Sequence, residues 1–252
     1  MSIDVTWLGH ATVVLDVDGT RLVSDPLLRP HAGVLRRRTP PPDAATWAGT
    51  SAVLLSHLHL DHADVRSLRM LPGVPVITAG DNARWVRRKG LLAQVPDGGG
   101  WIRVGDGSVE VRLVPAVHRS RPMPHRPNAA NGHLVRSSSG VVWIAGDTEL
   151  FPGLVELPRL AGAAVDVAIV PVGGWGPRLS AGHLGPDEAA EACRAVGARC
   201  AVPYHWATLH LPGGRDRPRG WMDAAGPAFE AALEPPCRPV VLGVGESVTV
   251  AG

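Results

Sequence analysis

The feature that most constrains this chain is a run of metal-binding side chains placed directly after an apolar run. Residues 52–55 are all aliphatic, and the next seven residues read Ser-His-Leu-His-Leu-Asp-His. In an extended segment His57 and His59 point to the same side, whereas the adjacent Asp61 and His62 cannot share that direction. If the chain turns after His59, the pair His57 and His59 and the pair Asp61 and His62 can bind at two neighbouring positions. The pattern therefore predicts two metal ions, although a histidine-rich surface loop is the simpler alternative.

Imidazole and carboxylate ligands suit Zn²⁺, and also Fe or Mn. Two ions need more ligands, and His118, Asp147 and His205 each stand just beyond an apolar run. Sites in sheet-based folds gather at one edge of the sheet, so we expect these residues to join the histidine run. Taken singly, a histidine after a strand is more often structural, and Asp147 could cap a helix or a turn. Their shared position relative to the strands favours ligands.

Short β-like runs dominate the first part of the chain and alternate with helical stretches later. Strands are expected at residues 5–8, 11–17, 21–24, 52–56, 74–78, 109–117, 141–145, 165–170, 200–203 and 240–243, with a hairpin turn at Asp18-Gly19. Helices are expected at residues 64–71, 81–89, 186–196 and 224–233. No linker or repeat divides the chain, so we expect one domain over residues 1–252. The fold class is α/β, with layers of sheet covered by helices.

Composition excludes several classes of protein. The chain has 252 residues, of which 45% are hydrophobic and 19% charged, which is typical of a globular protein. A formal net charge of +2 is too balanced to argue for nucleic acid, so none is expected as a partner. No run of apolar residues is long enough to span a membrane, and the N-terminus lacks the features of a secretory signal. Three cysteines without metal-type spacing indicate reduced thiols, and we expect a cytoplasmic protein.

The motifs together resemble the metallo-β-lactamase superfamily over nearly the whole chain. Beside the histidine run, the matching segments are Trp-Leu-Gly-His-Ala-Thr at residues 7–12, Ser-Asp-Pro at 24–26, Pro-Ala-Val-His at 115–118, Ala-Gly-Asp-Thr at 145–148 and Pro-Tyr-His-Trp-Ala-Thr at 203–208. Residues 170–177 and 182–189 look like a segment of the phospholipase members. The chain is most similar to the branch that contains L-ascorbate-6-phosphate lactonase and N-acyl-phosphatidylethanolamine-hydrolysing phospholipase D.

The resemblance implies an αββα sandwich with a dinuclear metal site at one edge. It assigns the ligands as follows: His57, His59 and His118 to one metal, Asp61, His62 and His205 to the other, and Asp147 as the bridge. Asp25 would hydrogen-bond a ligand imidazole and fix its tautomer, or would only form a turn. His10 would line the site or pack in the core. Asp64 would support the site or cap the following helix.

The expected function is hydrolysis by a hydroxide that bridges two divalent ions, with zinc favoured over manganese or iron. Asp61 and His183 are the candidate catalytic residues. His183 would bind an oxygen or protonate the leaving group, or would be structural. The glycine-rich segment at residues 173–175 favours a phosphodiester substrate, as in a phospholipase D. Opening of a lactone or carboxylic ester is the alternative.

Other classes fit the residues less well. Di-iron redox relatives typically carry Glu where His59 stands and have an attached flavin domain. Nucleases of the superfamily carry large inserts, for which the span between Asp147 and His205 is too short. β-Lactamases lack the ligand His62, and a non-catalytic scaffold would be expected to have lost ligands.

The expected substrate is a small, anionic, lipid-like molecule. Trp175 and Trp206 flank the proposed site in sequence and would form an apolar wall, or ordinary core. Arg119 begins a loop at residues 119–132 whose basic side chains could form a lid that attracts an anion, or a solvated loop. The chain leaves open whether the protein forms a homo-oligomer.

Overall fold

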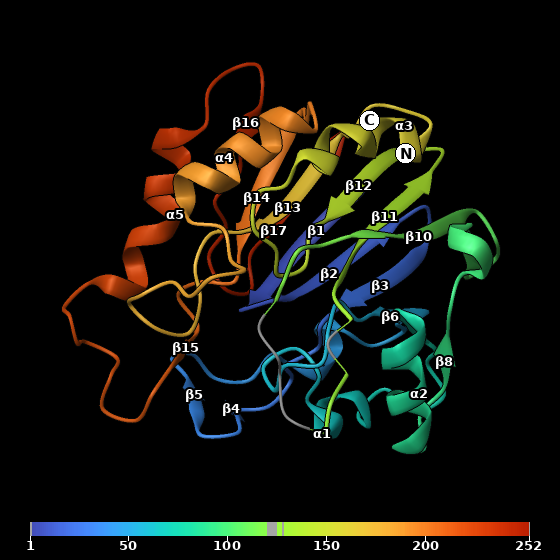
Figure 1. The fold of residues 1–252 in the computed structure, drawn as a ribbon. Helices are drawn as coiled ribbons and strands as arrows, with labels where there is room; N and C mark the ends of the chain where they lie inside the picture. The colour runs from blue at the N-terminus through green and yellow to red at the C-terminus, as the bar shows by residue number, and fades with distance from the viewer. Residues whose placement is uncertain (1, 120–124, 128, 252) are drawn as a thin grey trace.

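Two facing β-sheets form the centre of the computed structural model, which describes residues 2–119, 125–127 and 129–251 (Figure 1). Within these residues the first sheet has seven strands in the order β17 (Ser247–Ala251), β1 (Ser2–Gly9), β2 (Thr12–Val17), β3 (Thr20–Ser24), β6 (Ala52–Leu54), β7 (Val76–Ile77) and β8 (Ala93–Gln94). The second has seven in the order β16 (Arg238–Pro239), β14 (Cys200–Tyr204), β13 (Val167–Pro171), β12 (Gly140–Ile144), β11 (Asn131–Ser137), β10 (Val109–Pro115) and β9 (Ile102–Val104). A small sheet joins β15 (Leu209–His210), β5 (Leu35–Arg37) and β4 (His31–Ala32).

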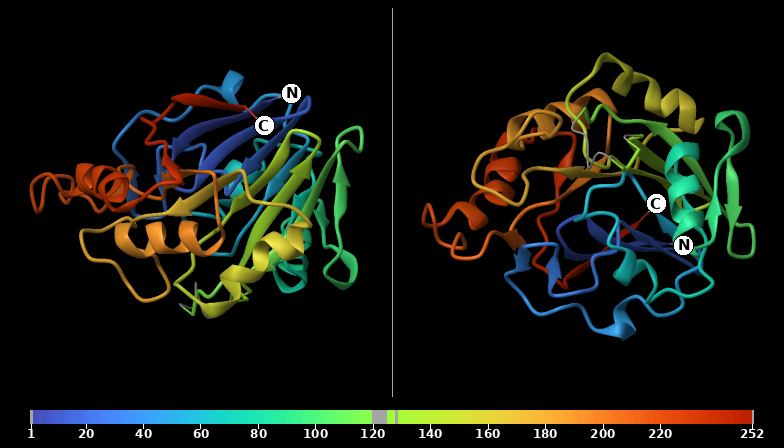
Figure 2. Two further views of the ribbon diagram at one scale, coloured as in Figure 1. Left: turned by 90° about the horizontal axis from the view of Figure 1, so that it is seen from above. Right: turned by 60° about the horizontal axis from the view of Figure 1, so that its bottom comes forward.

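Helices cover the outer faces of both sheets (Figure 2). The α-helices are α1 (Val65–Leu68), α2 (Gly80–Arg88), α3 (Leu157–Ala161), α4 (Pro186–Ala195) and α5 (Trp221–Ala232). Short 3₁₀ turns occupy Ala44–Thr46, Asp97–Gly99 and Pro152–Glu156. Leu68 and Trp85 of the first two helices pack on Val53 and Val76 of the first sheet. The other three helices cover the second sheet, so the chain has the αββα layers that the family resemblance implied.

The core between the sheets follows from alternation along the strands. In β1, Ile3, Val5 and Trp7 are buried and face the inner side of the second sheet, where Val142 and Ile169 meet them. Alternating burial is the signature of a strand that has one face on a core. No helix in the described parts of the chain is long and apolar enough to cross a membrane.

The element predictions were correct in type for most of the chain and wrong at several boundaries. The helix expected at residues 64–71 is a single turn, Val65–Leu68, which Asp64 caps by accepting a hydrogen bond from the Ser67 amide at 3.1 Å. Residues 240–243 are not a strand. Two longer strands were missed: β11, and β17, which closes the first sheet against β1. The sequence analysis also missed helix α3 and the short strands β4, β5, β8, β9, β15 and β16. The predicted hairpin at Asp18-Gly19 is present, with both residues at positive φ.

Strand direction determines at which edge of the sheets the candidate ligands lie. The strands β12, β13 and β14 run parallel, and β10 runs in the same direction because two antiparallel pairings separate it from β12. Their carboxyl ends therefore meet at one edge of the second sheet. In the first sheet β3, β6 and β7 are also parallel. The loops that follow these strands carry the side chains described next.

Candidate metal centre

The predicted ligands gather at this edge in two groups. In the first group, one potential ligand atom from each of His57, His59, His118 and Asp147 lies within 4.8 Å of the others. In the second group, the same holds for His10, Asp61, His62 and His205. The first two histidines follow β6, His118 follows β10, Asp147 follows β12 and His205 follows β14. His10, which was expected either to line the site or to pack in the core, stands within the second group.

The Asp147 carboxylate lies between the two groups. Its Oδ2 atom is 3.7 Å from His57 Nε2 and 3.2 Å from His62 Nε2, and its Oδ1 atom is 3.3 Å from His205 Nε2. The side chain is buried, and Oδ1 has no hydrogen-bond partner. A buried carboxylate oxygen without a partner is costly, and a cation would satisfy it.

Hydrogen bonds hold the imidazoles so that they present one nitrogen to the centre. His118 Nδ1 donates to the Gly182 carbonyl at 2.7 Å, and His205 Nδ1 donates to the Gly173 carbonyl at 2.9 Å. Both carbonyls belong to the segment between β13 and α4. Since a neutral imidazole carries one N–H, these bonds leave Nε2 as a lone-pair donor in both rings.

Asp25 and Ser56 orient the imidazoles of His57 and His62 in the same way. His62 Nδ1 lies 2.8 Å from Asp25 Oδ2. Ser56 Oγ donates to the same carboxylate oxygen at 2.6 Å and therefore accepts from His57 Nδ1 at 2.9 Å. The sequence analysis singled out Asp25 but missed Ser56, whose only signal was its place next to His57.

The donor set fits two cations. The Nε2 atoms of His62 and His205 are 3.0 Å apart, although both rings hold their proton at Nδ1. His59 Nδ1 similarly lies 2.8 Å from His57 Nε2 and 3.1 Å from His118 Nε2. The lone pairs of His62 Nε2 and His205 Nε2 repel each other unless a metal ion or a proton lies between them. Imidazole nitrogen and carboxylate oxygen suit Zn²⁺, and also Fe or Mn.

The protonation states of Asp147, His57 and His205 favour metal binding. Burial alone would raise the pKa of Asp147, but the charges of His205 and His62 outweigh it and hold that pKa well below its usual value. Burial lowers the pKa of His57 and of His205 well below the ordinary value for histidine. A charged carboxylate and neutral imidazoles are the forms that bind a metal.

His62 differs from these residues in its protonation. Burial would lower its pKa, but the charges of Asp147, Asp25 and Asp61 outweigh this effect and raise that pKa well above the ordinary value. A metal that binds there must therefore displace a proton.

His10 contacts the centre through Asp61. Its Nε2 atom is 2.8 Å from Asp61 Oδ2, and its ring centroid is 4.0 Å from that of His205. The residue adopts φ = 52° in the turn between β1 and β2, and its carbonyl accepts the His205 amide at 2.8 Å. His10 is thus placed to orient Asp61 and His205 as well as to offer a nitrogen.

His183 reaches the centre from the segment that supplies the two carbonyls. Its Nε2 atom is 3.2 Å from Asp147 Oδ2, and its Nδ1 atom is 3.1 Å from both the hydroxyl and the carbonyl of Ser180. Burial lowers the pKa of His183, but the hydrogen bond and charge of Asp147 outweigh this effect and raise it. His183 is therefore a potential proton donor beside the centre.

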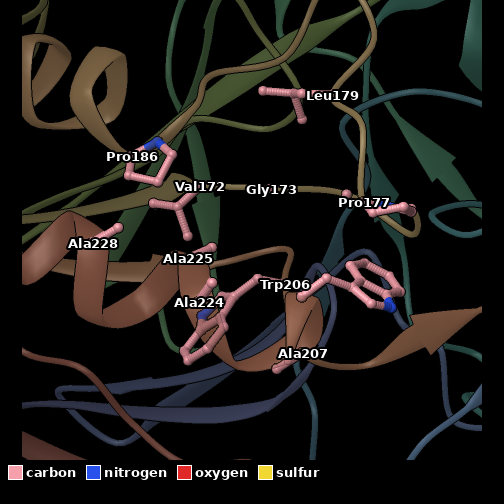
Figure 3. Close-up of a pocket in the computed structure, with 13 residues that line it drawn as sticks. Val172, Gly173, Pro177, Leu179, Pro186, Trp206, Ala207, Ala224, Ala225 and Ala228 are labelled. Atoms are coloured by element: carbon pink, nitrogen blue, oxygen red, sulfur yellow. The ribbon is translucent and has the colours of Figure 1, made fainter. Parts of the chain in front are cut away.

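A hollow of about 370 Å³ opens onto this centre. Its lining residues are Ala32, Val34, Leu35, His59, Leu60, Asp61, Trp175, Ser180, His183 and Leu211. Trp175, expected to line the pocket, is among them. Trp206 lies elsewhere: it stacks on Trp7 at 5.5 Å and lines a second, apolar hollow between the segment after β13 and helix α5 (Figure 3).

The basic side chains expected in a lid have different surroundings. Arg119 has an 84% exposed side chain near Glu149 and is not among the described residues that line the hollow. Arg126 is buried: it donates to the Leu58 carbonyl at 2.5 Å and lies over the Trp85 ring. It therefore braces the loop that carries His57 and His59. Arg121 lies outside the described residues, as do residues 120–124 and 128 of the segment expected to form the lid.

Comparisons with known proteins agree with this architecture. A family model described as a β-lactamase superfamily domain matches residues 20–206. A UPF0173 metal-dependent hydrolase of Pyrobaculum neutrophilum is 31% identical over 211 residues, which cover 82% of this chain and 85% of that protein. The N-acyl-phosphatidylethanolamine-hydrolyzing phospholipase D 1 of Caenorhabditis elegans is 26% identical over 230 residues, which cover 82% of this chain and 64% of that protein.

A solved structure supports the same fold. Igni18, a metallo hydrolase of Ignicoccus hospitalis, superposes with a TM-score of 0.77 at 21% identity, and the alignment covers the whole of both chains. At this identity the likeness concerns the fold alone. Together with the family model, which spans most of the sequence, and the 31% identical relative, it leads to one conclusion: the chain belongs to the metallo-β-lactamase superfamily.

Proposed function

We propose that this protein is a metal-dependent hydrolase that uses two divalent ions to cleave an ester-type bond, in the first instance a phosphodiester. The observation that carries the proposal is the Asp147 carboxylate, which lies within 3.7 Å of histidines from both ligand groups. A shared carboxylate between two sets of imidazoles is suited to a dinuclear site. Its relatives support the general class, because several carry the name metal-dependent hydrolase.

The ligands in this proposal are His57, His59 and His118 for one ion, Asp61, His62 and His205 for the other, and Asp147 between them. Bound divalent ions would polarise the bond under attack and lower the pKa of water, so that a nucleophile exists at neutral pH. Zinc is the first choice, with manganese or iron as alternatives. Asp25, Ser56 and the carbonyls of Gly173 and Gly182 keep the imidazoles in the tautomer that binding requires.

His183 is the residue proposed to protonate the leaving oxygen. It lines the hollow with His59 and Asp61, and Ser180 holds its Nδ1 side. A protonated Nε2 close to Asp147 could donate to an oxygen that departs from the reacting centre. Asp61 would take part in the reaction by binding metal in an orientation that His10 maintains.

A carboxylic ester or lactone is the second candidate substrate. No Arg or Lys occurs among the described residues that line the hollow. A neutral substrate needs no such partner, whereas a multiply charged phosphate is usually met by Arg or Lys. The nematode relative supports the first candidate, a phosphodiester, because its name describes a phospholipase D.

The test is hydrolysis by protein loaded in parallel with Zn²⁺, Mn²⁺ or Fe²⁺. We expect two metal ions per chain by elemental analysis and metal-dependent cleavage of bis(p-nitrophenyl) phosphate or of p-nitrophenyl esters. The variant His59→Ala should lose this activity, while His31→Ala, which changes a histidine outside both ligand groups, should keep it. Two bound ions without any cleavage of either substrate class would contradict the proposal, as would full activity in His59→Ala.

A further inference from the structure

The hollow at the metal centre has an unusual wall. Four of its lining residues are large hydrophobic side chains that remain exposed: Val34 (71%), Leu60 (43%), Trp175 (44%) and Leu211 (46%). Only eight large hydrophobic side chains are exposed among all described residues, so half of them surround this one hollow. Exposed apolar groups that gather at one place mark a binding surface, whereas scattered ones are ordinary.

These four residues, the apolar rim, come from four parts of the chain that meet around the centre. Val34 lies in the turn between β4 and β5, and Leu211 follows β15, which pairs with β5. Leu60 stands between the ligands His59 and Asp61, and Trp175 belongs to the segment that also carries His183. The rim is therefore continuous with the residues proposed to carry out the reaction.

The base of the rim is firmly packed. The small sheet that carries Val34 and Leu211 has its own buried cluster, which comprises Leu27, Ala32, Leu35 and Leu209. Buried Arg37 ties this sheet to the first sheet by donating to the carbonyls of Leu8 at 2.6 Å and Leu27 at 3.0 Å. Val34 and Leu211 therefore stand on a packed support.

The polar residues among the described lining are His59, Asp61, Ser180 and His183. All of them except Ser180 belong to the candidate metal centre or contact Asp147 within it. A sugar or nucleoside would need hydrogen-bond partners along the rest of the wall, where an unpaired polar group is costly. An alkyl or acyl chain would bury the exposed side chains of the rim, and the removal of both apolar surfaces from water would favour binding.

We propose that the apolar rim selects substrates in which the hydrolysed ester or phosphodiester carries an alkyl or acyl chain. This inference rests on the proposed function, since the rim would act on the substrate of that same centre. Leu60, Trp175 and Leu211 are the specificity-determining residues, and the chain of the substrate lies against them while its reactive group lies at the metals.

A binding measurement tests the rim separately from catalysis. Alkylphosphonates with ethyl to octyl chains would be titrated calorimetrically into the metal-loaded protein, below their micelle concentrations. Each added methylene should tighten the dissociation constant about two- to fourfold while the chain still contacts the rim. The variants Trp175→Ala and Leu211→Ser should flatten this dependence, and Val155→Ser, which changes an exposed apolar residue away from the hollow, should retain it.

Measurements of kcat/KM provide a second test of the dependence on chain length. With p-nitrophenyl esters and alkyl p-nitrophenyl phosphates of increasing chain length, kcat/KM should rise by a similar factor per methylene, and the loss in Leu211→Ser should grow with chain length. Dissociation constants that do not change with chain length, or that change equally in wild type and both rim variants, would overturn the inference. Chain-dependent binding without hydrolysis of either substrate series would instead overturn the proposed function and leave the rim as a recognition surface.

Discussion

Asp25 Oδ2 lies 2.8 Å from His62 Nδ1, and the same carboxylate accepts the Ser56 amide at 2.8 Å and the Ser56 hydroxyl at 2.6 Å. One buried acid at the end of β3 thus orients His62 directly and His57 through Ser56. It connects the two ligand groups from behind, on the side opposite to Asp147. Outer partners of this kind fix the tautomer and direction of a ligand imidazole.

The variant Asp25→Asn should weaken metal binding by about 10- to 100-fold, because an amide holds the two imidazoles less firmly than a carboxylate. Competition with a chromogenic chelator would measure the affinity, and excess metal should restore part of the activity. Asp16→Asn is a suitable control, since Asp16 pairs with Arg21 at the surface, where ion pairs contribute little. Unchanged affinity in Asp25→Asn would contradict the role given to this residue.

Gly182 offers a second test, on the His118 side of the centre. Its φ is +85°, and a Cβ atom there would stand 2.8 Å from His118 Nδ1. The variant Gly182→Ala should displace the imidazole and break its hydrogen bond to the Gly182 carbonyl. We expect loss of one of the two metal ions, measured by elemental analysis, together with a large fall in activity.

Gly213→Ala separates this effect from backbone strain. Gly213 has φ = +75°, but a Cβ atom there would meet nothing within 4 Å. Both variants carry a comparable conformational penalty of about 1 kcal/mol, whereas only Gly182→Ala disturbs a ligand. Equal metal content in the two variants would show that the contact with His118 is unimportant.

The layered fold and the grouping of the candidate ligands were predictable from the sequence because both depend on local patterns. Apolar alternation marks strands, and His118, Asp147 and His205 stand at equivalent places after them. The alternation of strand-like and helix-like stretches predicted layers of sheet covered by helices, whereas the αββα arrangement itself was implied by the resemblance of the motifs to the metallo-β-lactamase superfamily.

What could not be predicted depends on contacts between distant segments. The carbonyls of Gly173 and Gly182 act through the backbone, which leaves no signature in residue type. His10 reaches Asp61 only because β1 and β6 belong to one sheet and the β1–β2 turn opens toward the second ligand group. Arg126 belongs to the basic segment that was expected to form a lid or a solvated loop, but the fold buries it against Trp85 and the Leu58 carbonyl.

Asp147→Asn tests whether the two ligand groups form one centre. Replacing the carboxylate by an isosteric amide removes the charge that both groups share, while the strands on either side stay intact. Activity should fall by more than the roughly 10- to 100-fold typical of outer-partner changes, with one metal ion lost and a circular dichroism spectrum like that of the wild type. Full activity in a metal-replete Asp147→Asn protein would exclude the dinuclear mechanism.

His133 gives a prediction about acid stability that does not depend on the metal ligands. This residue lies on β11, fully buried, and its burial lowers the pKa to about 4 from an ordinary value of 6.5. The unfolded chain therefore binds a proton at His133 below pH 6.5, whereas the folded chain does so only near pH 4. The stability contributed by the neutral ring is present above pH 6.5 and is lost as the pH falls from 6.5 toward 4.

Between pH 8 and pH 5 this difference in proton binding should lower the free energy of unfolding by about 2 kcal/mol. His133→Gln keeps a polar group near the Ile77 carbonyl, 3.3 Å from the present Nε2 atom, but cannot titrate. Urea unfolding of both proteins at several pH values would isolate the effect, because proton binding at the other histidines is common to the two. Parallel stability curves for wild type and His133→Gln would mean that His133 does not contribute to acid sensitivity; convergence of the curves as the pH falls is the expected result.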